Sequence, residues 1–168
     1  MPIVEPEVLM DGPHTVDRCL EVTEGTLNAV YDELFEQGVK LEGTILKPNM
    51  VVSGTECPTQ AGVEEVAEKT VQCLLRAVPS AVPGIVFLSG GQSDLDATAH
   101  LDVMNRGFDV PWRLSFSYGR ALQAAPLKAW GGKKGNIKAA SEAFAHRARM
   151  NGLATAGKWE AALEKEAA

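Results

Sequence analysis

The chain has 168 residues, of which 45% are hydrophobic and 23% are charged, and its net charge at pH 7 is -6. These values fit one soluble domain of ordinary size, and the negative charge argues against a surface for nucleic acid or an anionic membrane. No segment reaches the roughly 20 consecutive apolar residues of a membrane span, and no signal-peptide pattern occurs at the N-terminus. Cys19, Cys57 and Cys73 are odd in number and lack metal-like spacing, so we expect neither a disulfide framework nor a zinc site.

The chain begins with a β-prone apolar segment, residues 2–7, which is followed by a long helical pattern. In this pattern apolar residues recur at three- and four-residue steps from Val16 to Leu34, and Gly38 follows as a C-terminal cap. A second β-prone segment, residues 43–47, comes next. Helices and β-prone segments then keep alternating along the chain. In order, they are a helix over 63–78, a strand over 84–89, a short helix that begins at the capping pair Ser93 and Asp96, a strand over 113–118, and a helix from 137 to near 157.

Four successive β/α units predict parallel strands joined by right-handed helical crossovers. An open sheet of four strands has two unpaired edges, whereas a closed (β/α)₈ barrel of about 250 residues has none. The predicted fold is therefore α/β, the (β/α)₄ half of a TIM barrel over residues 1–157, with a C-terminal tail over 158–168. A small open α/β sheet is the alternative, but its phosphate-binding motif should follow the first strand, where Glu5, Pro6 and Glu7 stand.

Lys47 lies at the end of the second β-prone segment, where Pro48 prevents the strand from continuing as a central one. If these segments are barrel strands, their C-terminal ends share the face on which such barrels place their active sites. A lysine there could form a Schiff base if its neutral amine is favoured by partial burial. Glu5 and Glu7 are two residues apart on the first strand, so both point to one face, and Lys47 is the available cation. A solvent-reaching lysine and a structural ion pair remain the simpler interpretations.

The third and fourth strands end in residues that could hold an anion. Ser89 and Gly90 follow the third strand in a glycine-rich turn, and Gly119 and Arg120 follow the fourth. Glycines let backbone N–H groups approach a phosphate, and the guanidinium of an arginine can bind it with two hydrogen bonds. A glycine pair alone usually makes only a turn, but barrels often bind phosphate at their last two strands. The sequence therefore predicts a phosphate site here.

Longer segments around these positions resemble the class I fructose-bisphosphate aldolases. They are PIVEPE at 2–7, LEGTILKPNM at 41–50, FLSGGQS at 87–93, SFSYGRALQ at 115–123 and LKAWGG at 127–132. The resemblance implies a lyase of glycolysis and gluconeogenesis that reversibly cleaves fructose 1,6-bisphosphate to dihydroxyacetone phosphate and glyceraldehyde 3-phosphate. It implies a covalent lysine imine and no metal or other cofactor.

The same resemblance implies a role for each candidate residue. Lys47 is similar to the amine that forms the iminium with the ketose carbonyl. Glu5 resembles the acid/base group that assists loss of water, and Glu7 its electrostatic neighbour. The residues similar to the binding site for the C1 phosphate of the ketose are Ser89, Gly90, Gly119 and Arg120.

The chain departs from the family in two ways. Family members are roughly twice as long, and what resembles their second half begins here at Met1, so the aspartate and basic residues of the family's earlier strands have no counterpart. The family's C-terminal tyrosine is also missing, because no tyrosine follows Tyr118. We therefore expect the C-terminal half of an aldolase barrel, as a truncated product, an excised fragment or a distinct short chain.

The expected partners are a sugar phosphate and either further copies of the chain or a complementary N-terminal half-barrel, with no nucleic acid or membrane. The expected location is the cytoplasm, or a plastid if a transit peptide has been lost. Two other functions stay open. One is a catalytically silent half-barrel that binds sugar phosphates or acts as an interaction module, and the other is a different Schiff-base barrel, such as a transaldolase-like enzyme.

Overall fold

Four parallel strands form a single sheet in the order β1-β2-β3-β4 in the computed structural model, which describes residues 1–165. Their bounds are β1 Ile3–Val4, β2 Ile45–Leu46, β3 Gly84–Phe87 and β4 Arg113–Phe116. In the register of the sheet, Val4 lies opposite Leu46, Leu46 opposite Ile85, and Ile85 opposite Leu114. The predicted parallel pairing of neighbouring strands is confirmed.

The paired strands are shorter than the β-prone segments of the sequence. Extended backbone nevertheless continues the ladder beyond them, because Lys47 N donates to Val4 O at 2.7 Å and Leu88 N donates to Pro48 O at 3.1 Å. Ser117 N donates to Phe87 O at 2.9 Å in the same way. The C-terminal ends of the strands are thus held side by side, which brings the candidate residues to one edge of the sheet.

Helices follow each strand, as the alternation predicts. Their bounds are α1 Val16–Glu36, α2 Val63–Ala77, α3 Asp94–Gly107, α4 Arg120–Trp130 and α5 Ile137–Thr155, with short 3₁₀ turns η1 Leu41–Gly43, η2 Lys134–Asn136 and η3 Ala161–Lys165. Ser93 caps α3, because its Oγ accepts from Asp96 N at 3.0 Å and donates to the Asp96 carboxylate at 2.7 Å. The capping pair expected from the sequence is therefore confirmed.

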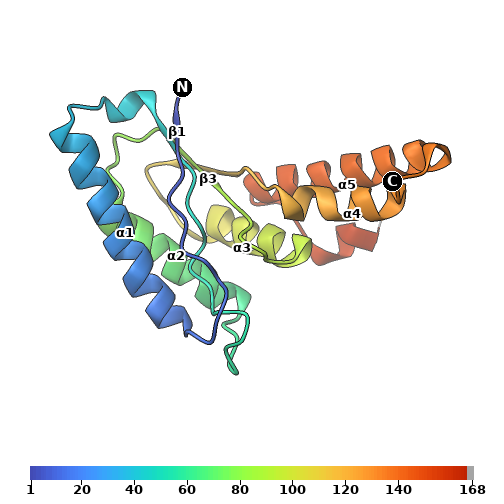
Figure 1. The fold of residues 1–168 in the computed structure, drawn as a ribbon, viewed down its shortest axis with the longest axis horizontal. Helices are drawn as coiled ribbons and strands as arrows, with labels where there is room; N and C mark the ends of the chain where they lie inside the picture. Colours follow the sequence, from blue (N-terminus) through green and yellow to red (C-terminus); the bar gives the residue numbers. More distant parts are fainter. Residues whose placement is uncertain (166–168) are drawn as a thin grey trace.

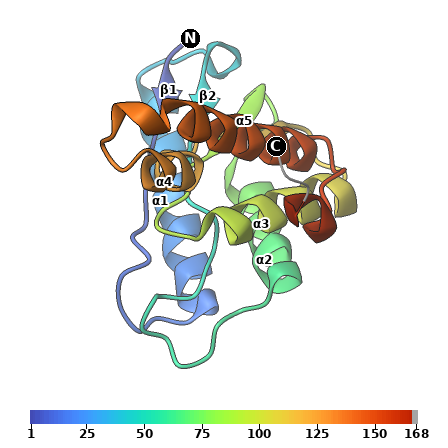
Figure 2. The ribbon, with the colours of Figure 1, turned by 90° about the vertical axis from the view of Figure 1, so that its right-hand side faces the viewer.

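The helices form one layer along the strands (Figures 1 and 2). α1 packs on α2, α2 on α3, and α3 on α5, while α4 and α5 lie together as a pair beyond α3. The core lies between this layer and the sheet, where Leu46, Ile85 and Phe87 meet apolar side chains such as Leu74 and Leu101. The chain is thus the (β/α)₄ half of a TIM barrel.

Helix α4 is present in the structure but was not predicted from the sequence. Pro126 lies inside it and has no N–H to donate, so the helix lacks a backbone hydrogen bond there. The residues on both sides are good helix formers, Gly131 ends the helix in a left-handed conformation with φ +55°, and α5 packs along it. Tertiary packing therefore outweighs the hydrogen bond that Pro126 cannot make.

All three cysteines are free and buried. Burial raises the pKa of the Cys73 thiol to about 12, so this side chain acts as a small apolar core residue. Within residues 1–165, no helix is long and apolar enough to span a membrane.

The C-terminal segment is attached to α3 and α5. Trp159 N donates to the Asp102 carboxylate at 2.8 Å, and Trp159 Nε1 donates to Glu164 at 2.8 Å. Both Nη atoms of the buried Arg147 donate to Glu164, at 3.0 and 2.5 Å. The division into a half-barrel over 1–157 and a tail over 158–168 stays a prediction, and residues 166–168 lie outside the described residues.

Candidate active site

Lys47 and Glu5 form an ion pair across the ends of β2 and β1. Lys47 Nζ lies 2.7 Å from Glu5 Oε1, and the side chains of Lys47 and Glu5 are 19% and 50% exposed. The carboxylate reaches the lysine because the two strands are parallel neighbours and each residue directly follows its strand. A largely covered amine next to a carboxylate that water can reach is suited to proton exchange.

Glu7 lies further along the same extended segment. It is exposed, as is Glu5, while Pro6 and Val8 between and after them are partly buried. The two carboxylates therefore share one face, as their spacing predicts, but in residues 1–165 only Glu5 is paired with Lys47. Glu7 can therefore make the electrostatic potential near Lys47 more negative, but it is not placed to contact the amine.

Asn49 fixes the segment that carries Lys47. Its Oδ1 accepts from Val8 N at 3.0 Å, and its Nδ2 donates to Thr23 Oγ1 at 3.1 Å. This buried side chain ties the chain after β2 to the chain after β1 and to α1. It was not among the candidate residues, although the motif that contains Lys47 includes it.

The glycine turn after β3 adopts conformations that other residues rarely take. Gly90 has φ +58° and Gly91 has φ +102°. A Cβ at Gly91 would lie 3.6 Å from Arg120 Nη1 and 3.3 Å from Met10 Sδ. The guanidinium of Arg120 therefore lies next to the bare backbone of Gly91, in the glycine-rich turn where the sequence predicts a phosphate site.

Ser89 connects the two candidate phosphate-binding segments. Its Oγ accepts from Ala121 N at 3.5 Å, in the first turn of α4, and no acceptor within residues 1–165 takes its own hydrogen. Gly119 is the N-cap residue of α4, and Arg120 is the first residue of the helix. N–H groups at a helix start and the positive end of its dipole favour an anion, and Arg120 has no ion-pair partner within residues 1–165.

The geometry thus places an amine and a carboxylate at the ends of β1 and β2, and an anion-binding turn at the ends of β3 and β4. In the described part of the chain, no three His, Cys, Asp or Glu side chains group as metal ligands would. This arrangement suits a phosphorylated carbonyl compound, with the carbonyl at Lys47 and the phosphate at the glycine turn.

Comparison with known proteins settles the family. The model of the family described as "Fructose-bisphosphate aldolase class-I" matches residues 1–168. The chain belongs to the class I fructose-bisphosphate aldolase family. The resemblance seen in the motifs is therefore confirmed over the whole chain.

Individual relatives agree with this assignment. The chain is 55% identical over 161 residues to a probable fructose-bisphosphate aldolase class 1 of Xylella fastidiosa, covering 95% of this chain and 48% of the relative. It is 53% identical to the fructose-bisphosphate aldolase of Dictyostelium discoideum, covering 95% and 44%. The chain spans about half the length of the curated relatives it matches.

A solved structure confirms the fold. A fructose-bisphosphate aldolase from Plasmodium falciparum, in complex with TRAP and a small-molecule inhibitor, superposes with a TM-score of 0.92 and 51% identity. The match covers 95% of this chain and 46% of that one. The four β/α units therefore have the arrangement of part of an aldolase barrel.

Proposed function

We propose that this chain supplies the Schiff-base part of a fructose-bisphosphate aldolase, in glycolysis and gluconeogenesis. The observation that carries the proposal is the ion pair between Lys47 and Glu5, at 2.7 Å. Pro48, the next residue, accepts a hydrogen bond from Leu88 N, just before the glycine turn. An amine attacks a carbonyl only after it loses its extra proton, and here a carboxylate lies within hydrogen-bond distance to take it. The proposed chemistry needs no metal or other cofactor.

In the first stage, Glu5 takes a proton from the Lys47 ammonium group, and the free Nζ attacks C2 of fructose 1,6-bisphosphate. A proton then passes from the new ammonium to the C2 oxygen, which gives a carbinolamine. Glu5 returns its proton to this C2 hydroxyl, which leaves as water, and the positive charge stays on the iminium nitrogen. Glu7, exposed on the same face, adds negative potential that favours the iminium.

In the second stage, the C3–C4 bond breaks and its electron pair moves into the iminium, which becomes a neutral enamine. The C4 hydroxyl loses its proton and becomes the aldehyde of glyceraldehyde 3-phosphate. Protonation of the enamine at C3 and hydrolysis release dihydroxyacetone phosphate and restore Lys47. We assign the base for the C4 hydroxyl to a complementary half-barrel, since the carboxylates assigned here serve the iminium step.

The glycine turn is the proposed binding site for the C1 phosphate of the ketose. Ser89 would donate its hydroxyl hydrogen, Gly90 and Gly119 their backbone N–H groups, and Arg120 its guanidinium. The contact distance of 3.6 Å between a Cβ at Gly91 and Arg120 Nη1 supports this, because it places the guanidinium directly against the bare backbone of the turn. Anchoring the phosphate would place C2 reproducibly at Lys47.

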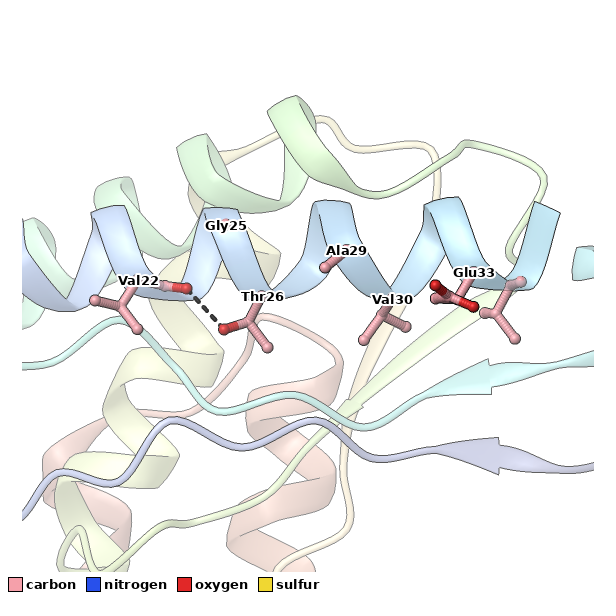
Figure 3. A pocket seen from close by; sticks show the side chains of 7 residues that line it. Val22, Gly25, Thr26, Ala29, Val30 and Glu33 are labelled. Atoms are coloured by element: carbon pink, nitrogen blue, oxygen red, sulfur yellow. Dashed lines mark hydrogen bonds between the residues drawn. The ribbon is translucent and has the colours of Figure 1, made fainter. Parts of the chain in front are cut away.

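The free edge of β1 and one flank of α1 are the proposed contact for the complementary half-barrel. Ile3 is 54% exposed, and a shallow groove of about 760 Å³ runs along α1. Figure 3 shows Val22, Thr26 and Val30 along this flank, where Thr26 Oγ1 donates to Val22 O at 2.8 Å and so leaves an apolar surface. A second copy of this chain is the other candidate for this contact. We place the assembled enzyme in the cytoplasm.

The first test is reduction with borohydride in the presence of dihydroxyacetone phosphate. An iminium is reduced to a stable secondary amine, so a Schiff-base enzyme gains the mass of the ketose less one oxygen atom, because water is lost and two hydrogens are added, whereas a protein that only binds sugar phosphates gains no mass. Binding of dihydroxyacetone phosphate without any covalent adduct would favour the second candidate function, a silent half-barrel, which the arrangement of Ser89, Gly91 and Arg120 could also serve.

A further inference from the structure

Two side chains outside the glycine turn, those of Gln92 and His100, restrain it through hydrogen bonds. Gln92 Nε2 donates to the carbonyl oxygen of Ser89 at 3.1 Å, and the backbone N of Gln92 donates to the same oxygen at 2.9 Å. Gln92 Oε1 in turn lies 2.7 Å from Nδ1 of His100, a buried residue of α3. Ser89, Gln92 and His100 therefore form a chain of hydrogen bonds, which we call the relay.

The carbonyl oxygen of Ser89 determines which group donates and which accepts in each hydrogen bond of the relay. A backbone carbonyl only accepts, so the Gln92 amide must turn its NH₂ group toward Ser89 and its oxygen toward His100. An amide oxygen also only accepts, and Nδ1 of His100 must therefore carry the hydrogen. Burial lowers the pKa of His100 to about 4, so the ring is neutral at pH 7 and Nε2 keeps its lone pair.

The turn needs such a restraint from outside. Gly90 and Gly91 have no side chains to pack, and glycine has more backbone freedom than any other residue. Gln92 and His100 also line a cavity of about 360 Å³ between the first turns of α2 and α3, and His100 Nε2 has no partner in residues 1–165. Without the bond to His100, the Gln92 side chain has space in this cavity to turn away from Ser89.

We infer that His100 is a positioning residue for the proposed phosphate site: its Nδ1–H orients Gln92, which fixes Ser89 and the glycine turn next to Arg120. The relay continues to α4, because the Oγ of Ser89 accepts from Ala121 N at 3.5 Å. One histidine on α3 thereby stabilises both segments that would surround the phosphate. The inference rests on the proposed function, since it concerns the same phosphate site.

The test compares three variants of the full chain. H100L removes the donor but keeps an apolar side chain in a buried position, and Q92M removes the amide. H100N is the matched control, because the Nδ2 of asparagine is as many bonds from Cα as the Nδ1 of histidine and can donate to Gln92.

Binding of inorganic phosphate and of dihydroxyacetone phosphate is measured by calorimetry at pH 7.5. We expect H100L and Q92M to weaken binding about three- to tenfold, as loss of one hydrogen bond would, and H100N to bind within about twofold of the unmodified chain.

A second readout does not depend on phosphate. In chains labelled with ¹⁵N-histidine, NMR distinguishes a ring protonated at Nδ1 from one protonated at Nε2, and we expect the Nδ1 form for His100. An Nε2-protonated ring would overturn the relay whatever the affinities are. Normal binding by both H100L and Q92M would overturn the inference alone. If the unmodified chain binds neither phosphate, the proposed function and the inference both fail.

Discussion

Glu5 Oε1 lies 2.7 Å from Lys47 Nζ, and the two residues belong to neighbouring strand ends that are 42 positions apart in the sequence. The parallel pairing of β1 and β2 produces this contact, because Val4 and Leu46 are opposite each other and the next residue on each strand is part of the pair. The relation between fold and proposed chemistry is therefore direct. A shift of one residue in register would turn one of the two side chains to the other face of the sheet.

Glu5→Gln should slow formation of the iminium. Glutamine keeps the size of the side chain but cannot take the proton from Lys47 or return it to the carbinolamine. We expect the rate of borohydride trapping with dihydroxyacetone phosphate to fall about 100-fold, within the usual range for loss of a general acid or base. Glu7→Gln is the matched control and should slow trapping much less, because Glu7 does not contact Lys47. Equal losses in the two variants would contradict the role of Glu5.

Arg120→Ala should weaken ligands that carry a phosphate. We expect a loss of about 1.5–3 kcal/mol for dihydroxyacetone phosphate, the scale of a hydrogen bond to a charged group, and almost no loss for unphosphorylated dihydroxyacetone. Calorimetric titration of both ligands makes the comparison. Arg113→Ala, at an exposed position at the start of β4, is the control and should bind both ligands normally. Losses that are equal for the two ligands would refute a phosphate-specific role.

Arg147→Met should destabilise the fold without reaching the proposed site. Its side chain is 4% exposed and its guanidinium contacts Glu164 and Asp94, so its removal leaves Glu164 without its main cationic partner. Burial alone would raise the pKa of Glu164. Hydrogen bonds from Arg147 and Trp159 nevertheless hold the pKa of Glu164 below its usual value. We expect the free energy of unfolding to fall by about 3 kcal/mol.

Lys138→Met is the control for this experiment. Lys138 pairs with Glu142 at 3.8 Å on the exposed surface of α5, and its side chain is 89% exposed. Its replacement should change the free energy of unfolding by less than about 1 kcal/mol. Urea titrations of both variants provide the measurement, and similar values for the two would show that the buried cluster does not stabilise the chain.

His100 should make stability depend on pH. Burial lowers its pKa from 6.5 to about 4, although Asp96 and Glu64 nearby act in the opposite direction. Between these two values the unfolded chain binds more protons than the folded one, so this stabilisation is complete above about pH 6.5 and is lost as the pH falls to about 4. Its size is on the order of 3 kcal/mol. The difference in free energy of unfolding between the unmodified chain and H100N should therefore shrink from pH 7 to pH 4, and a constant difference would contradict the burial of a neutral ring.

Much of this fold follows from local patterns in the sequence. The apolar spacing between Val16 and Leu34 has the period of a helix, and Ser93 with Asp96 marks a helix start, so the β/α alternation could be predicted. The strand ends that carry Lys47 and Arg120 follow from that alternation alone. The family motifs then indicated a role for each of these residues.

Other features depend on contacts that no local pattern contains. The helix α4 includes Pro126 and is stabilised by packing on α5. The bond between His100 and Gln92 joins a helix to a loop, and its direction depends on a third group, the carbonyl of Ser89. One partner of Arg147, Glu164, lies 17 residues away in η3. Each of these requires the three-dimensional arrangement of the elements.

The central claim is that Lys47 is the residue that forms the imine. Its most direct test is to reduce the chain with borohydride in the presence of dihydroxyacetone phosphate and to locate the adduct by peptide mass spectrometry. The account predicts one labelled peptide, modified at Lys47, and no label in Lys47→Arg, because a guanidinium does not form the iminium. A label on the exposed Lys40 or Lys128 that persists in Lys47→Arg, or no label in the unmodified chain, would contradict it.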